Sequence, residues 1–262
     1  MPTIKEAISA AVPQLEVMSD SPRLDAECLL AFVLEQSRSY LMTYPERPLS
    51  VLQQCTFARL LLRRIKGEPV AYLLAEQEFY GLSLRVTPAV LIPRPDTESL
   101  VDWILSRYDV SSSLRVLDCG TGSGAIAIAL AQSRPTWKIV ASDLSEDALV
   151  VAADNVQRHQ LSQIKLLQSD WFDQIEVGGF DVIVVNPPYI AQNDTHLSAL
   201  TFEPQSALVA ADDGLADIDR ILRQAQSYLT AAGVILIEHG CDQGERVVQL
   251  ACQYGWLRPC TY

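Results

Sequence analysis

Apolar residues recur at intervals of three and four along the N-terminal part of the chain, from Thr3 to about Ala75. This spacing places them on one face of an α-helix. Three sets are separated by helix signals: Asp20-Ser21-Pro22 precedes the second set, Ser50 precedes the third, and Gly67 ends it. Their members are Ile4, Ile8, Ala11, Val12 and Leu15, then Leu24, Cys28, Leu29, Phe32 and Val33, then Leu52, Phe57, Leu60, Leu61 and Ile65. We expect residues 1–76 to form a small helical bundle that docks a substrate and carries no chemistry.

The pattern changes between residues 77 and 96. Phe79 to Val86 alternates around Gly81, which predicts a short hairpin. The segment Leu91-Ile92-Pro93-Arg94-Pro95-Asp96-Thr97-Glu98 follows, and its two prolines keep the backbone extended and stiff. We expect residues 77–96 to form a hairpin and linker, with a helix from about Thr97 to Arg107 after them.

From Leu114 onward, short apolar runs alternate with helical patterns, and this alternation predicts a parallel, doubly wound sheet. The expected strands are Leu114–Asp118, Lys138–Asp143, Ile164–Gln168, Asp181–Val185 and Val234–Glu238. The expected helices are Ala125–Gln132, Glu146–His159, Ala216–Leu229 and Gly244–Tyr254. Residues 97–262 are therefore predicted to form an α/β domain.

Composition narrows the function classes. The 262 residues are 49% hydrophobic, so the chain can bury a substantial core. Lysine and arginine number 20 against 32 acidic residues, and this net charge of −12 argues against a nucleic-acid-binding surface. The longest apolar run, Ala125 to Ala131, is far short of the roughly 20 residues of a membrane span. With no secretory signal and no CxxC pair, we expect a cytoplasmic protein with free thiols.

A glycine-rich loop follows the first expected strand of the sheet. In Val116-Leu117-Asp118-Cys119-Gly120-Thr121-Gly122-Ser123-Gly124, the glycines let the backbone turn sharply and let a ligand approach its amides. A dinucleotide-binding loop reads GxGxxG and cradles pyrophosphate, whereas this loop reads GxGxG. Asp118 ends the strand, and its carboxylate suits a cationic ligand such as S-adenosylmethionine. The alternative is a tight strand-to-helix turn without a ligand.

Acidic residues also follow the next two expected strands. Asp143 lies 19 residues after Gly124, a separation at which a carboxylate can accept both hydroxyls of a ribose. Asp143 could instead cap the helix that follows, a role that Ser145 could also fill. Asp170 can accept the exocyclic amine of adenine. Its neighbour Trp171 either lines the base or packs in the core.

The fourth expected strand ends in Asn186-Pro187-Pro188-Tyr189. Two prolines fix the chain and remove two backbone donors, which leaves the Asn186 side-chain oxygen and the Pro187 carbonyl as acceptors. A planar NH2 group can donate one hydrogen to each, beside the flat face of Tyr189. The motif is typical of a site that holds an amino or amide nitrogen with its lone pair aimed outward.

Together these motifs resemble class I S-adenosylmethionine-dependent methyltransferases that act on nitrogen, over about residues 114–240. Further segments make the chain very similar, over nearly its whole length, to the peptide chain release factor glutamine methyltransferases, the PrmC/HemK family. These segments are Phe79-Tyr80-Gly81, Leu91 to Glu98, Asn186 to Ile190, Phe202-Glu203-Pro204, Ala207-Leu208-Val209-Ala210, Asp213-Gly214-Leu215 and Glu238-His239-Gly240.

The resemblance implies a Rossmann-like methyltransferase domain that transfers a methyl group from S-adenosylmethionine to a protein. The acceptor would be the side-chain amide nitrogen (N5) of the glutamine in the Gly-Gly-Gln (GGQ) loop of class I release factors. The implied cofactor site comprises Gly120, Thr121, Gly122, Ser123, Gly124, Asp143, Asp170, Trp171 and Asn186, and it includes no metal. The implied substrate clamp comprises Asn186, Pro187, Pro188 and Tyr189.

Three alternatives remain at this point. The same clamp serves methyltransferases of DNA adenine and rRNA guanine, since a flipped base also presents a planar NH2 group. The acidic charge and the lack of an insertion rich in lysine and arginine argue against them, and we expect no direct nucleic-acid binding. A second alternative is a relative that methylates a glutamine of a large-subunit ribosomal protein, although Arg94 to Glu98 look more like the release-factor branch.

The third alternative is a homologue that binds cofactor without turnover. Family members end in two more strands, whereas only Trp256 to Tyr262 follow Gly255, so the C-terminus looks short. The Val234–Ile237 strand would then be a bare apolar edge, unless a partner chain or Leu257–Tyr262 pairs with it.

Overall fold

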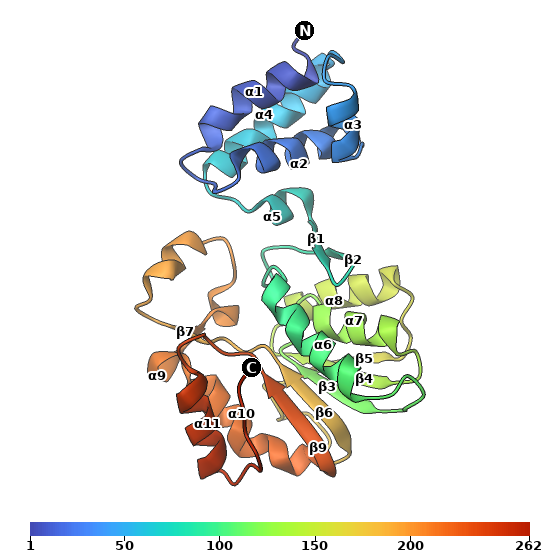
Figure 1. Ribbon diagram of the computed structural model, residues 1–262, viewed down its shortest axis with the longest axis vertical. Coiled ribbons are helices and arrows are strands. Elements are labelled where there is room, and N and C mark those ends of the chain that lie inside the picture. Colours follow the sequence, from blue (N-terminus) through green and yellow to red (C-terminus); the bar gives the residue numbers. More distant parts are fainter. The chain divides into compact units, whose positions relative to one another are not determined.

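The computed structural model describes residues 1–262, and the chain divides into two compact units, Met1–Glu76 and Gln77–Tyr262 (Figure 1). The first unit is helical. Its helices are α1 (Ile4–Leu15), α2 (Pro22–Leu34), α3 (Arg38–Thr43), α4 (Val51–Ile65) and α5 (Val70–Leu74).

Capping fixes where the predicted helices of this unit begin. Thr3 and Glu6 form a reciprocal capping box at the start of α1, and Ser50 and Gln53 form one at the start of α4. Pro22 occupies the first turn of α2, where a missing backbone N–H costs nothing. These local signals explain why the expected starts of these helices agree with the structure.

The buried face of α2 differs from the expected one. Leu24 and Phe32 are 40% and 49% exposed, whereas the neighbouring acids Asp25 and Glu27 are buried. Asp25 accepts from Arg64 Nε of α4 at 2.7 Å, and Glu27 accepts from Arg38 at 2.8 Å. Apolar spacing alone misplaces this face because ion pairs let charged residues occupy buried positions.

The second unit contains the sheet. Its strands are β1 (Glu76–Phe79), β2 (Leu82–Arg85), β3 (Arg115–Cys119), β4 (Lys138–Asp143), β5 (Ile164–Gln168), β6 (Phe180–Val185), β7 (Ile190–Ala191), β8 (Val209–Ala210) and β9 (Leu229–Ile237). Its helices are η1 (Pro95–Thr97), α6 (Glu98–Arg107), α7 (Ala125–Ser133), α8 (Glu146–Arg158), η2 (Thr195–Ala199), η3 (Gln205–Ala207), α9 (Ala211–Gly214), α10 (Ala216–Gln224), η4 (Ala225–Tyr228) and α11 (Gly244–Gln253).

Five strands form one parallel sheet in the order β5-β4-β3-β6-β9. Alternate residues face opposite sides: Val182 and Val184 of β6 join the core beneath α6 and α7, whereas Ile183 and Val185 join the core beneath α10 and η4. Figure 1 shows these helices on the two faces of the sheet. The predicted doubly wound α/β fold is confirmed.

β9 departs from its expected bounds. It begins at Leu229 rather than Val234, and a register shift between Phe180 and Val182 of β6 accommodates the extra residues. The helix expected over Ala216–Leu229 correspondingly ends as α10 and η4 at Tyr228.

β9 lies at the edge of the sheet, and residues 257–262 do not pair with it. The Tyr262 ring instead lies 6.5 Å from the Trp103 ring of α6. Trp256 donates from Nε1 to the Leu222 carbonyl of α10 at 2.9 Å. None of the helices combines the length and apolar character required to cross a bilayer.

Candidate active site at the carboxyl ends of the strands

A cavity of about 410 Å³ lies at the carboxyl ends of β3, β4, β5 and β6. Ligands of open α/β sheets bind in this place, where the strand order reverses about β3. The volume lies within the range of small-molecule sites. The cavity brings together residues from segments far apart in the chain, and the following paragraphs take these segments in turn.

The glycine-rich loop forms one wall. Gly120 and Gly122 line the cavity with φ of +73° and +55°, a backbone conformation that favours glycine. Thr121 and Ser123 line it as well. Gly124 does not: its φ is +85°, and a Cβ there would lie 3.0 Å from Ile128 Cδ1. Gly124 therefore allows the tight turn into α7 and does not contact a ligand.

The sequence predicts that the Asp118 carboxylate faces a cationic ligand. This prediction is wrong, because Asp118 does not line the cavity. It is 1% exposed, and its Oδ2 accepts from Thr121 Oγ1 at 2.6 Å and from the Ala127 backbone nitrogen at 3.2 Å. Burial raises its pKa to about 7, and these two hydrogen bonds oppose the shift. The carboxyl therefore ties the loop to the first turn of α7 from the inside.

Asp143 lines the cavity at the end of β4. Its Oδ2 accepts from Gly122 N at 2.9 Å and its Oδ1 from Ser145 N at 2.9 Å. Burial raises the pKa of Asp143, and the backbone hydrogen bonds oppose that shift. Ser145 caps α8 by accepting from Ala148 N, so Asp143 is not that cap. Each carboxylate oxygen retains acceptor capacity for a ligand.

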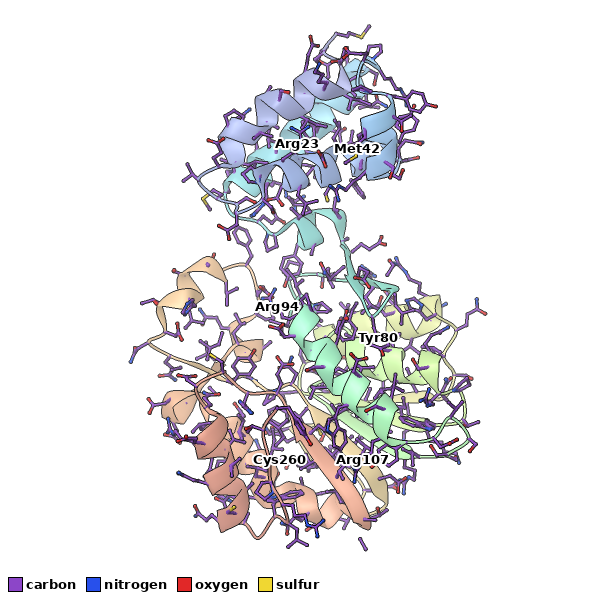
Figure 2. All side chains as sticks on the ribbon, viewed as in Figure 1. Arg23, Met42, Tyr80, Arg94, Arg107 and Cys260 are labelled. Carbon is purple, nitrogen blue, oxygen red and sulfur yellow. The ribbon has the colours of Figure 1, made fainter.

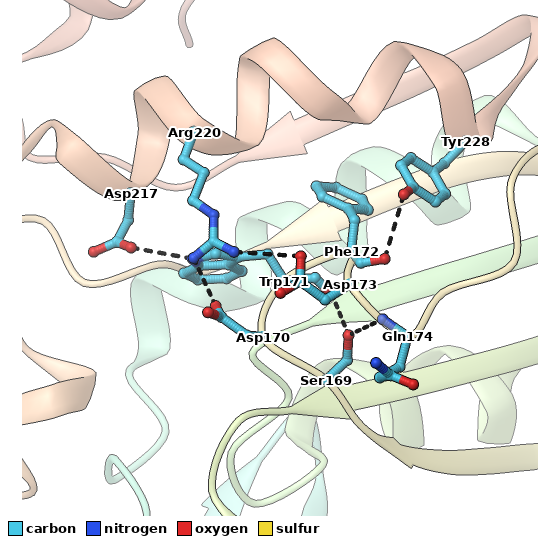
Figure 3. Close-up of polar contacts among 9 residues, drawn as sticks. All are labelled: Ser169, Asp170, Trp171, Phe172, Asp173, Gln174, Asp217, Arg220 and Tyr228. Carbon is cyan, nitrogen blue, oxygen red and sulfur yellow. Dashed lines mark hydrogen bonds and ion pairs between the residues drawn. The ribbon is translucent and has the colours of Figure 1, made fainter.

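The Asp170 and Trp171 side chains line the cavity after β5, held by two residues of α10 (Figure 3). Arg220 donates to Asp170 Oδ1 at 2.8 Å, and Trp171 Nε1 donates to Asp217 Oδ1 at 3.1 Å. Trp171 has a φ of +48°, and its ring lies against Gly120, where a Cβ would be 3.4 Å from Cζ3. The indole thus packs on the core and also borders the cavity, so its two proposed roles are compatible.

Only part of the clamp motif lines the cavity. Asn186 and Pro188 line the cavity, whereas Pro187 and Tyr189 do not. Asn186 Nδ2 donates to Thr97 Oγ1 at 3.1 Å, which leaves the Asn186 Oδ1 free as an acceptor. The Tyr189 hydroxyl donates to Glu238 Oε1 at 3.2 Å. Burial and the adjacent Glu238 carboxyl raise the pKa of Tyr189 to about 12, so the phenol stays neutral.

Several lining residues are absent from the site residues expected from the sequence, although three of them belong to segments that carry the family resemblance. They are Arg94 and Thr97 before α6, Pro204 and Ser206 before β8, and Asp217 and Arg220 of α10. Arg94 lies just before the N-terminal end of α6 (Figure 2). It donates to Glu203 Oε1, while Ile92 N donates to Glu203 Oε2 at 3.0 Å. These pairings span 109 and 111 residues, and local spacing does not reveal contacts at that separation.

The donor and acceptor set of the cavity fits S-adenosylmethionine. A ribose diol requires a paired acceptor, which Asp143 offers with both oxygens anchored by backbone N–H groups. An adenine ring requires a flat apolar neighbour, which Trp171 offers beside Gly120. A ligand can approach the loop closely only where no side chain intervenes. The space beside Gly122 is open, because nothing lies within 4 Å of a Cβ built there.

Comparisons with known proteins agree with this assignment. The family "Methyltransferase small domain" matches residues 96–203, and the family "PrmC N-terminal domain" matches residues 6–74. A curated Coxiella burnetii protein named "Release factor glutamine methyltransferase" is 46% identical over 250 residues, covering 95% of this chain and 90% of the relative. A Salmonella typhimurium protein of the same name is 49% identical over 231 residues, covering 87% of this chain and 83% of the relative.

The likeness to solved structures concerns the fold alone. The hMettl16 catalytic domain in complex with MAT2A 3'UTR hairpin 1 has a TM-score of 0.55 at 17% sequence identity. The match covers 76% of this chain and 72% of that one.

Proposed function

The chain belongs to the release factor glutamine methyltransferase family and is an S-adenosylmethionine-dependent enzyme, and from this premise we propose its substrate and the residues that act on it. The substrate is the GGQ loop of a class I peptide chain release factor, methylated on the side-chain amide nitrogen (N5) of the glutamine. One observation supports this most directly. Asn186 borders the cavity with its amide nitrogen held by Thr97, so that an amide oxygen is left to receive a substrate N–H.

The chemistry demands such a clamp because an amide nitrogen is a poor nucleophile with its lone pair delocalised into the carbonyl. Asn186 Oδ1 accepts one amide hydrogen at the cavity wall, and the carbonyl of the adjacent Pro187, which lies beyond the wall, accepts the other, so that the plane of the group is fixed. Orientation of this kind contributes up to about 7–11 kcal/mol in favourable cases. As the nitrogen gains a methyl group its positive charge grows, so both hydrogen bonds strengthen in the transition state before one proton leaves to solvent.

The cofactor supplies the electrophilic methyl group when bound. Gly120, Thr121, Gly122 and Ser123 would border it with a loop whose first three N–H groups are already held by Ser142 and Asp143, and Asp143 would accept the ribose hydroxyls. Asp170 and Trp171 would hold the adenine, with the Trp171 indole as its apolar neighbour. Gly124 belongs to the turn into α7 and supports the loop without lining the cavity.

Residues 1–76 dock the release factor in this proposal. A groove on this unit is lined by Phe32 of α2 and Thr56 of α4. Leu52 lies one turn before Thr56 on α4 and is 76% exposed. An exposed apolar surface of this kind is typical of a protein contact.

The test is the intact mass of a purified class I release factor, made in a host without this activity, after incubation with the enzyme and S-adenosylmethionine. We expect a gain of one methyl group that maps to the GGQ glutamine. Asn186→Ala abolishes the gain and leaves cofactor affinity mostly intact. The exposed amide Gln253 of α11 supplies a matched control, Gln253→Ala, which methylates as the wild type does.

Two outcomes contradict the proposal. Methylation at another residue, or of a ribosomal protein in preference to the release factor, assigns a different substrate. No methylation by an enzyme that still binds cofactor assigns the chain a binding role without turnover.

A further inference from the structure

Four polar side chains from three segments meet at the clamp. Thr97 precedes α6, Asn186 and Tyr189 follow β6, and Glu238 follows β9. The Glu238 backbone N–H donates to the Val185 carbonyl at 3.0 Å, which anchors it beside the residue that precedes Asn186. The proposed reaction gives Glu238 no role, and Thr97 enters it only as the partner of Asn186 Nδ2.

The contacts set a direction of hydrogen bonding. Asn186 Nδ2 is the donor to Thr97 Oγ1 at 3.1 Å, so the hydroxyl hydrogen of Thr97 remains available for another acceptor. Thr97 is only 4% exposed, so water does not readily accept it. Glu238 Oε2 is buried and has no hydrogen-bond partner, whereas Oε1 accepts from the Tyr189 hydroxyl at 3.2 Å.

The neighbours of Glu238 behave as donors. Burial raises the pKa of this carboxyl, and the polar side chains of Thr97, Tyr189 and Asn186 around it oppose the shift. Tyr189 donates to Oε1, which leaves the buried Oε2 as an acceptor for the spare hydroxyl hydrogen of Thr97. A carboxylate only accepts hydrogen bonds. A hydroxyl that donates to it keeps its lone pairs for the Asn186 amide nitrogen.

We propose that Thr97 and Glu238 are positioning residues for methyl transfer: Glu238 directs the Thr97 hydroxyl, and Thr97 then holds Asn186 Nδ2 so that Asn186 Oδ1 faces the cavity. This inference rests on the proposed function, in which Asn186 Oδ1 accepts a hydrogen from the substrate amide. Glu238 also holds the hydroxyl of Tyr189, so one carboxylate orients both polar ends of the clamp.

Without the hydrogen bond to Thr97, the Asn186 side-chain amide is free to rotate by about 180° and exchange the positions of its oxygen and nitrogen. Its NH2 group would then face the NH2 group of the substrate, and two donors cannot pair. Misorientation of a reacting group by about 1 Å costs on the order of 10²-fold in rate. We expect the loss to fall on kcat, because the Asn186 amide is misplaced whether or not substrate and cofactor are bound.

Thr97→Val removes the hydroxyl at nearly constant shape, and Thr97→Ser retains it. We expect Thr97→Val to lower kcat on the order of 10²-fold with cofactor Kd and thermal stability close to wild type, and Thr97→Ser to restore most of the rate. Wild-type kcat in Thr97→Val overturns the inference. Equal losses of rate and stability in both variants also overturn it, since that result assigns Thr97 a packing role.

Glu238→Gln tests the carboxylate. Since the acceptor form is ionised, wild-type kcat rises as the pH increases through the Glu238 pKa, which burial holds above its usual value of 4.5. The titratable and charged groups near it are Tyr189 and Asp96. Glu238→Gln loses this limb of the profile and keeps, at every pH, the low kcat that the wild type shows below the Glu238 pKa. An unchanged limb in Glu238→Gln contradicts the role of the carboxylate.

A readout without any substrate separates this inference from the proposed function. The chain has only three asparagines, Asn155, Asn186 and Asn193, so 15N-asparagine labelling gives three side-chain NH2 signals. We expect the Asn186 pair, assigned by its loss in Asn186→Ala, to exchange slowly in the wild type and in Thr97→Ser and rapidly in Thr97→Val. Slow exchange with an unmethylated release factor overturns the function alone. Unchanged exchange in Thr97→Val overturns the positioning role alone.

Discussion

The Trp171 indole nitrogen donates a hydrogen bond to the Asp217 carboxylate across 3.1 Å, although 46 residues separate them in the chain. Trp171 has a left-handed backbone, which is strained for a bulky residue, and Asp217 holds the ring at the cavity wall in spite of it. α10 thus helps to shape the wall that is proposed to receive adenine.

Asp217→Ala is therefore expected to weaken the binding of S-adenosylhomocysteine. A hydrogen bond to a charged group contributes about 1.5–3 kcal/mol, so a loss of about tenfold in affinity follows when water replaces part of the contact. Isothermal titration calorimetry measures it. Asp242→Ala, an exposed acid before α11, is the control and should bind as the wild type does. Equal affinity for both variants would show that Trp171 needs no support from α10.

Glu203→Gln is expected to lower the free energy of unfolding by about 1–3 kcal/mol, because it weakens a buried acceptor of two donors. The donors are Arg94 and the Ile92 backbone, and both belong to the segment that borders the cavity. Urea unfolding measures the loss against the exposed control Glu176→Gln. We also expect a higher KM for the release factor in Glu203→Gln, and an unchanged unfolding midpoint would remove the basis for both effects.

Gly214→Ala is expected to destabilise the protein by about 3 kcal/mol and to abolish activity, through backbone strain and overpacking together. Gly214 has a φ of +84°, and a Cβ there would lie 2.0 Å from the Tyr189 carbonyl oxygen. Gly178→Ala is the matched control, with a φ of +83° and nothing within 4 Å of the added Cβ. Its expected cost is about 1–2 kcal/mol, from conformation alone. Similar losses in the two variants would indicate that the Tyr189 backbone can move aside.

Asp118 is expected to give stability a specific dependence on pH. Its folded-state pKa is raised to about 7 by burial, against about 3.9 in an unfolded chain. The folded state binds the proton more tightly, so the contribution is complete below about pH 4 and is lost as the pH rises to about 7. The difference in unfolding free energy between wild type and Asp118→Asn should decline across this range in cofactor-free protein. A constant difference would mean that Asp118 titrates normally.

Local sequence signals account for the fold and for part of the site. The sequence predicts the strands β3 to β6 closely because each is a short buried apolar run bounded by turns, and the polar residues that follow or end them lie at one edge of the sheet by geometry. Asp143 and Asn186 follow from that rule. Asp118 also ends a strand, but its side chain turns inward to Thr121, a choice that depends on tertiary packing.

The residues missed by sequence reasoning share one property. Thr97, Glu203 and Asp217 act through partners that are 46 to 111 residues away along the chain. Their spacing within their own segments is ordinary. Thr97 precedes a helix and Asp217 lies in the first turn of one, positions where polar residues are common for reasons of capping and helix dipole. Only the assembled sheet reveals their second role.

Because β9 lies at the edge of the sheet, we expect the enzyme to lose activity on heating through local opening of this strand. β9 has β6 as its sole neighbour in the sheet, and the last bond of that ladder joins Glu238 to Val185, the residue before Asn186. Strand edges open by fraying well below the temperature of global melting. On heating, amide exchange should therefore accelerate first along β9, and turnover should fade while the helical signal of the chain is still intact. The half-life of activity at high temperature is then set by how long β9 stays hydrogen-bonded to β6.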